Sequence, residues 1–147
     1  MEHQIPTETL IGLDLTLIGD DFDLDYVTKQ LEIIPNYTRY KTEVLRNGNM
    51  FGHTEWGMCF ESHPSWYLED LFNEMYQVFK NKEKLLANVA KQCNAEWNAV
   101  YIVEIKNGDI PVLLFKKNMI DFFHEIGAEV GFDMYICPDN EEKDSNT

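Results

Sequence analysis

The sequence predicts an α+β domain with an antiparallel or mixed sheet of about five strands and helices mainly on one face. Residues 9–18 alternate between apolar and polar side chains, which is typical of a half-buried strand. Residues 66–79 instead place apolar side chains every three and four positions, which is typical of an amphipathic helix. The predicted order of elements is strand, helix, strand, strand, helix (one or two), strand, helix, strand. Its first six elements match a ferredoxin-like β-α-β-β-α-β unit, and a C-terminal α-β extension follows.

The first strand ends at Gly19, and an acidic turn leads into a short helix. Pro35 marks the far limit of that helix, because the residue before a proline avoids helical geometry. The apolar residues of the helix recur at spacings of three and four: Leu24, Val27 and Leu31.

Residues 37–46 alternate in the way expected of a second strand. Asn47-Gly48-Asn49 is a strong turn signal, so we expect a hairpin from this strand into a third strand at residues 52–60.

The helix at residues 66–79 has the heaviest apolar face in the chain, so we expect the sheet to pack on it. Ser65 is a good N-cap for this helix. A second helical pattern runs over residues 82–93, and Asn81 can interrupt the helix between the two patterns. The sequence leaves open whether residues 66–93 form one bent helix or a helix pair.

Residues 97–105 alternate again, but Val100 and Ile102 make the second face apolar too. This pattern predicts a central strand that is covered on both faces. The short apolar run at residues 110–115 is either a strand or an approach to the next helix.

A last helix is expected at residues 118–126. Gly127, the next residue, fits the left-handed C-terminal cap position. The last strand is expected at residues 130–136. We therefore predict one domain over residues 1–137 and a disordered acidic tail over residues 138–147.

The chain of 147 residues has a formal net charge of −14, from 12 basic and 26 acidic residues. Residues 1–28 hold seven acids and no Lys or Arg. Such a field repels nucleic acids and anionic membranes, and it would attract a basic protein partner. The plainer explanation is solubility alone.

No apolar run approaches the roughly 20 residues of a membrane span, and no signal peptide is visible. Three widely spaced cysteines without a CxxC pair are most simply reduced thiols. These features predict a cytoplasmic protein.

Five segments occur in a fixed order: Leu17-Ile18-Gly19, the run from Leu31 to Pro35, the lone Trp56, the long Leu-rich helix, and Ile126-Gly127-Ala128 leading to Phe132-Asp133-Met134-Tyr135. Together they resemble a bacterial family known only as domain of unknown function 4279. Glu32 stands where similar sequences often carry a glycine. The resemblance covers roughly residues 9–136 and implies a fold and a bacterial, cytosolic setting, but no catalytic residue.

Asp21, Asp23 and Asp25 have the spacing of the first calcium ligands in an EF-hand loop. Tyr26 stands where that loop needs a glycine, and Lys29 stands at a ligand position, so an acidic N-cap region is the better interpretation.

His53, Cys59 and His63 offer possible metal ligands, but His53 and Cys59 lie roughly 20 Å apart on an extended strand and cannot share one metal ion without a fold-back of the chain. The sequence has no GxSxG, Gly-rich phosphate loop or HExxH motif. We therefore predict no metal site and no cofactor, and the absence of these motifs favours a protein that is not an enzyme.

The predicted function is non-enzymatic binding of a protein, of an immunity or regulatory type, with a basic partner. Four acids would steer the partner and two aromatic residues would anchor it. These contact residues are Asp20, Asp21, Asp23, Asp25, Trp66 and Tyr67.

The alternative is a small-molecule-binding or hydrolytic domain with a site near the hairpin at residues 39–53. Its basic residues could bind an anion, although charges on an exposed hairpin also discourage edge pairing. The ligand-pocket candidates are Arg39, Lys41, His53 and Asp133.

Overall fold

The computed structural model describes residues 7–49 and 52–138 and contains one mixed sheet and four helices. The predicted α+β class is therefore confirmed. The elements in chain order are β1 (Leu10–Gly19), α1 (Leu24–Leu31), β2 (Tyr37–Arg39), β3 (Thr54–Pro64), α2 (Leu68–Phe79), α3 (Glu83–Cys93), β4 (Ala95–Ile105), α4 (Lys117–Glu125) and β5 (Glu129–Ile136).

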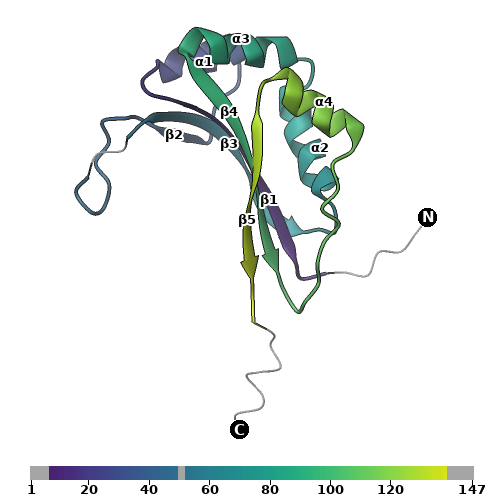
Figure 1. The fold of residues 1–147 in the computed structure, drawn as a ribbon. Helices are drawn as coiled ribbons and strands as arrows, with labels where there is room; N and C mark the ends of the chain where they lie inside the picture. Colours follow the sequence, from purple (N-terminus) through teal and green to yellow (C-terminus); the bar gives the residue numbers. More distant parts are fainter. Residues whose placement is uncertain (1–6, 50–51, 139–147) are drawn as a thin grey trace.

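The strands lie in the order β2-β3-β1-β4-β5, so β1 is the central strand (Figure 1). It pairs antiparallel with β3 and β4, and β2 pairs antiparallel with β3. This arrangement of the first four strands is the predicted ferredoxin-like unit. The extension adds β5 parallel to β4 at the edge of the sheet. Figure 1 shows the helices above and to the right of the twisted sheet, whose opposite face is bare.

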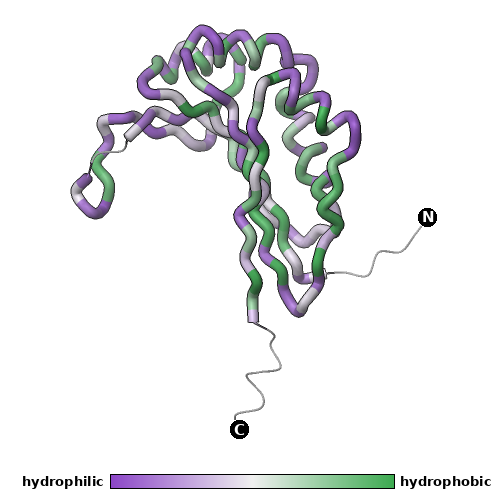
Figure 2. Tube along the Cα trace, viewed as in Figure 1, coloured by the Kyte–Doolittle hydropathy of each residue, from purple (hydrophilic) through white to green (hydrophobic). Residues whose placement is uncertain are grey.

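The core lies between the sheet and α2, as the apolar stripe of residues 66–79 predicts. On β1, the side chains of Ile11, Leu13, Leu15 and Leu17 are fully buried. They meet the buried face of α2, which includes Leu71, Phe72 and Met75. In Figure 2 hydrophobic segments follow the strands and α2, whereas hydrophilic segments lie along the outer turns of α1 and α3.

Residues 66–93 form two helices. Asn81 adopts a left-handed backbone with φ of 62°, which breaks the helical hydrogen-bond series between α2 and α3. The predicted N-cap at Ser65 is wrong, because α2 begins at Leu68 and has Tyr67 at the cap position. The Ser65 hydroxyl instead donates to Asp70 Oδ2 at 2.5 Å.

The predicted strand at residues 37–46 is too long, because β2 ends at Arg39. Beyond that point hydrogen bonds to side chains replace the ladder. The N–H of Tyr40 donates to Glu43 Oε1 at 3.2 Å, and the N–H of Lys41 donates to Thr54 Oγ1 at 3.2 Å. Residues 110–115 are not a strand but lead to the next helix, and Val112 makes an isolated bridge with Tyr67.

The prediction that β4 is covered on both faces is wrong. Its residues Trp97, Tyr101 and Val103 are buried, but Val100 and Ile102 are only partly buried. The reason is topological: the helices of the described chain all pack on the same side of the sheet (Figure 1). The apolar pair therefore lies on the bare face.

Glu32 ends α1 in a left-handed conformation with φ of 57°, where the Cβ atom of any residue other than glycine comes too close to the following carbonyl oxygen. We expect Glu32→Gly to raise the free energy of unfolding by up to about 1 kcal/mol, because glycine adopts this conformation without strain. Chemical denaturation would measure the change. The control Lys29→Gly, within α1, should lower stability by about 1 kcal/mol; a loss of stability in Glu32→Gly would contradict the expectation.

Candidate functional site

The bare face, meaning the side of the sheet away from the four helices, concentrates negative charge. Strand register fixes which side chains point to it, because successive residues of a strand alternate between faces. Arg39 of β2 is the basic residue that the paired strands place there. The carboxylates that the register places on this face are Asp14, Glu55, Glu96, Glu104, Glu129 and Asp133.

Asp14 lies near the middle of the bare face, opposite Cys59 on β3 and Val100 on β4. Burial raises the pKa of the Asp14 carboxyl; a hydrogen bond with the Cys59 thiol opposes that shift, and the charge of Asp133 adds to it. Burial and the same Asp14 charge raise the pKa of Cys59 to about 12. The thiol therefore stays protonated near neutral pH and cannot act as a thiolate nucleophile.

Asp14→Asn should stabilise the protein near neutral pH. A raised pKa in the folded state means that the ionised carboxylate opposes folding above that pKa, and that the penalty vanishes below the usual value of 3.8. We expect the melting temperature to rise by a few degrees at pH 7, since 1 kcal/mol corresponds to roughly 2–4 °C in a domain of this size.

Calorimetry at pH 7 and at about pH 3 would check this expectation. Glu129→Gln, at an exposed position of the same face, is the matched control and should change the melting temperature little. Equal stabilisation at both pH values would contradict the argument from burial.

The predicted acidic contact cluster lies in the turn between β1 and α1. Asp20 pairs with the Lys41 ammonium at 3.1 Å, and Asp23 is the N-cap of α1, where its Oδ1 accepts the N–H of Asp25 at 2.9 Å. Asp21 and Asp25 are exposed. Two of the four acids therefore have structural partners.

The predicted aromatic contacts lie at the other end of β1. The strand starts beside Pro64, close to Trp66 and Tyr67, and ends next to Asp20. Ten residues of strand span roughly 30 Å, so the structure separates the acidic and aromatic parts of the predicted contact set.

The predicted ligand-pocket residues are also separated. Arg39 is on β2 and Asp133 is on β5, at opposite edges of the sheet. Four strand spacings amount to about 19 Å. His53 instead contacts Glu55, with 2.8 Å between Nε2 and Oε2.

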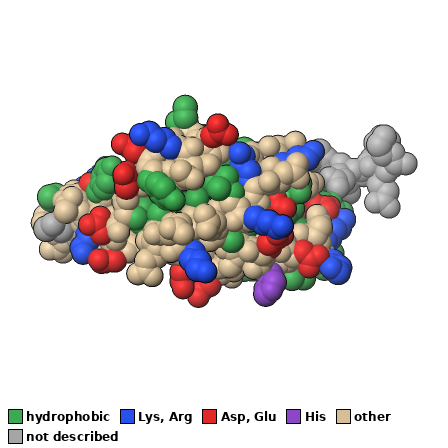
Figure 3. All heavy atoms as spheres, turned by 90° about the horizontal axis from the view of Figure 1, so that it is seen from above, with side chains coloured by type: hydrophobic (Ala, Val, Ile, Leu, Met, Phe, Trp, Pro, Cys, Tyr) green, Lys and Arg blue, Asp and Glu red, His purple; other side chains and the backbone are tan. Residues whose placement is uncertain are grey.

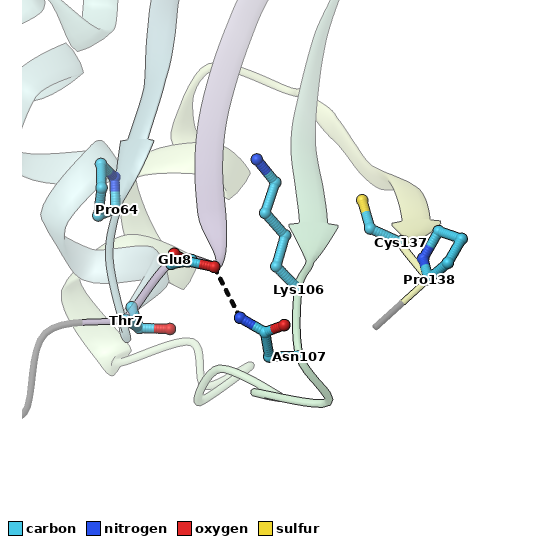
Figure 4. Close-up of a pocket in the computed structure, with 7 residues that line it drawn as sticks. All are labelled: Thr7, Glu8, Pro64, Lys106, Asn107, Cys137 and Pro138. Carbon is cyan, nitrogen blue, oxygen red and sulfur yellow. Dashed lines mark hydrogen bonds between the residues drawn. The ribbon is translucent and has the colours of Figure 1, made fainter. Parts of the chain in front are cut away.

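The end of the sheet holds a cavity of about 420 Å³, with Lys106 and Cys137 on one side and Glu8 on the other (Figure 4). The Asn107 side chain donates to Glu8 Oε2 at 2.6 Å, so the carboxylate already has a partner. Thr9 donates to the Asp109 carbonyl at 2.6 Å and fixes the same turn. The polar groups around the cavity therefore serve to hold the end of the sheet together.

Within residues 7–49 and 52–138, no group of three His, Cys, Asp or Glu side chains is placed to hold a metal ion. In the same part of the chain, no helix has the length and apolar character needed to cross a bilayer.

A family model described as "Domain of unknown function (DUF4279)" matches residues 9–137. The chain belongs to this family. The resemblance seen in the sequence is thereby confirmed, over almost the expected range. No curated protein and no solved structure matches the chain. Membership of DUF4279 assigns no activity.

The sequence contained only part of the signal for the bare face. Alternation identified the outward-facing acids within single strands, for example Asp14 on the first strand. The charge of Asp133 acts on Asp14 because both β1 and β5 pair with β4, one on each side. No local pattern in the sequence could show this.

Proposed function

We propose that this DUF4279 domain binds a basic protein partner through its bare face, as an immunity-type or regulatory protein rather than as an enzyme. The observation that carries the proposal is the set of six carboxylates on one uncovered sheet face. Seen from above in Figure 3, at the end where α1 and α3 lie, blue and red side chains stand side by side around hydrophobic groups. On the face without helices, the paired strands place these six carboxylates with one basic residue, Arg39.

The bare face covers much of the area that a protein contact needs. Four strand spacings by the length of β1 give roughly 19 Å by 30 Å, or about 600 Å². A stable interface buries about 800 Å² on each partner, so rims beyond the strands would contribute the remainder. Val100 and Ile102 supply an apolar centre, which the acidic residues surround.

Charge would act mainly on the association rate. The net charge of −14 attracts a basic protein over distances near the Debye length of about 8 Å. The exposed Asp21 and Asp25 would add to this steering from the β1–α1 turn. Contacts between the partner and the partly buried side chains at the centre of the bare face would set the lifetime of the complex.

At the centre of the face, burial favours the neutral forms of two titratable groups. Asp14 and Cys59 are the pair with shifted pKa values there, and both shifts favour the neutral form. Neither group is thereby activated as a nucleophile.

The test is a pull-down with the products of neighbouring genes at low and high salt, followed by titration of any captured protein. Glu96→Lys with Glu129→Lys reverses two exposed acids on adjacent strands of the bare face. We expect affinity to fall by about 100-fold, since two lost charge contacts amount to roughly 3 kcal/mol.

The matched control is Asp121→Lys with Glu125→Lys, which makes the same change in net charge on α4. It should lower affinity by less than about 5-fold, through long-range steering alone. Absent binding, salt-insensitive binding, or equal losses in the two double variants would overturn the proposal.

A further inference from the structure

The outer edge of β5 is long, apolar and unpaired within the described chain. β5 pairs with β4 and is the last strand on its side of the sheet. Exposed apolar side chains follow one another at alternate positions: Val130 (38%), Phe132 (39%), Met134 (45%) and Ile136 (82%). Such an edge is a template for pairing with another strand.

The hydrogen-bond pattern shows which backbone groups face outward. The N–H of Cys137 donates to the Ile105 carbonyl at 2.8 Å, so Cys137 points toward β4. Because strand residues alternate, the even-numbered residues from Val130 to Ile136 direct their N–H and C=O groups away from β4. Each of these four residues also has an apolar side chain on the helix side of the sheet.

The opposite edge of the sheet is different. β2 has only three residues, Tyr37–Arg39, and its Arg39 guanidinium lies near the Tyr37 ring. Short edge strands and basic side chains are the usual protection against edge pairing. The outward-facing positions of β5 lack such protection.

We propose that β5 pairs antiparallel with β5 of a second copy, which joins two sheets into one of ten strands. The twofold axis passes through Phe132, which lies opposite its own counterpart. Val130 then lies opposite Met134, and Asp133 lies opposite Gly131. Moving the axis to Asp133 would instead set two carboxylates against each other, which is unfavourable.

This register also matches a hollow to the side chains that fill it. A hollow of about 350 Å³ lies beside the start of β5. The proposed register brings Met134 and Ile136 of the second copy next to its rim, because they lie opposite Val130 and Ala128. The residues lining the hollow are Phe115, Ile120, Phe123, His124, Ala128 and Val130.

A second copy explains these features better than an unrelated peptide does. The side chains of Met134 and Ile136 lie at one end of β5, and the hollow lies at the other end. They can meet only when β5 of a second copy runs antiparallel to the first. The axis lies perpendicular to the sheet, since the paired residues point to the same face. The two bare faces would therefore form one continuous acidic surface.

The first measurement is the mass of the full chain in solution across a concentration series. We expect the mass to rise from 17.2 kDa toward twice that value. Added salt should strengthen the dimer, because it screens the repulsion between two copies of charge −14. A complex with a basic partner should weaken with salt, so the two proposals can fail independently.

Met134→Lys with Ile136→Lys should raise the dissociation constant of the dimer by at least about 30-fold. The control Ile34→Lys replaces an isoleucine that is 84% exposed, close to the 82% of Ile136, but lies away from β5. It should leave the dimer unchanged.

Hydrogen exchange by NMR tests the register. The amides of Val130, Phe132 and Met134 should gain protection as the dimer forms, whereas those of Gly131 and Asp133 should be protected in both states. A chain that stays monomeric up to about 1 mM, or a dimer that leaves the even-numbered amides unprotected, would overturn the inference.

Discussion

Replacing Trp97 by alanine should lower the free energy of unfolding by about 4 kcal/mol, in the range for a large aromatic side chain lost from a core. Trp97 is fully buried and packs edge-on against Trp56, with 6.0 Å between ring centroids. Its indole N–H donates to the Leu86 carbonyl at 2.8 Å, which ties β4 to α3. The variant removes both contacts and leaves a buried carbonyl without its donor.

Two substitutions make the Trp97 prediction specific. Trp97→Phe keeps a ring in the core but loses the hydrogen bond, so about 1–2 kcal/mol should be lost. Trp66→Ala, at a partly exposed position, should cost less than Trp97→Ala. Urea denaturation measures all three, and equal losses in Trp66→Ala and Trp97→Ala would contradict the core assignment.

Phe72→Ala should lower the free energy of unfolding by about 3–4 kcal/mol. Phe72 lies in an aromatic cluster that joins α2 to α4, with ring centroids 5.6 Å from both Phe122 and Phe123. Tyr76 stacks on Phe72 at 5.8 Å. Because α4 leads directly into β5, the loss should be felt most in the C-terminal extension.

Hydrogen exchange would locate the effect of Phe72→Ala. We expect faster exchange in α4 and β5 than in β1 and β3, because the cluster is the aromatic link between α2 and α4. Phe72→Leu retains most of the volume and should cost about half as much. Uniform loss of protection across all strands would show that the extension does not unfold separately.

Most elements of the fold could be predicted from local pattern. The alternation of residues 9–18 identified β1, and the stripe of residues 66–79 identified the helix that covers the core. Gly127 adopts the left-handed conformation expected after the last helix, with φ of 71°. In each case the determining interactions are between residues a few positions apart.

Prediction failed where residues distant in the sequence decide the result. The alternation of residues 37–46 continued past Arg39, but the ladder ends there and the N–H of Lys41 donates to the side chain of Thr54 on β3. Val100 and Ile102 suggested a covered face, yet the direction of the helical crossovers left it bare. The predicted disordered tail at residues 138–147 lies, apart from Pro138, outside the described residues and stays a prediction.

Only part of the candidate site could be predicted from the sequence, for the same reason. Composition revealed an acidic chain, and the motifs gave no reason to expect catalysis. Asp133 was singled out, but together with Arg39, which lies at the opposite edge of the sheet and at another level along the strands. Its electrostatic neighbour is Asp14, more than a hundred residues earlier in the chain.

The sequence by itself determined the class of this domain, its charge and the position of nearly every helix and strand, because periodicity and turn chemistry act over short stretches of chain. Only the tertiary structure decided which sheet face stays without helices and which edge strand is left unpaired. Those outcomes depend on strand order, and β1 acquires neighbours from residues 54–64 and 95–105 through pairings that no local pattern specifies.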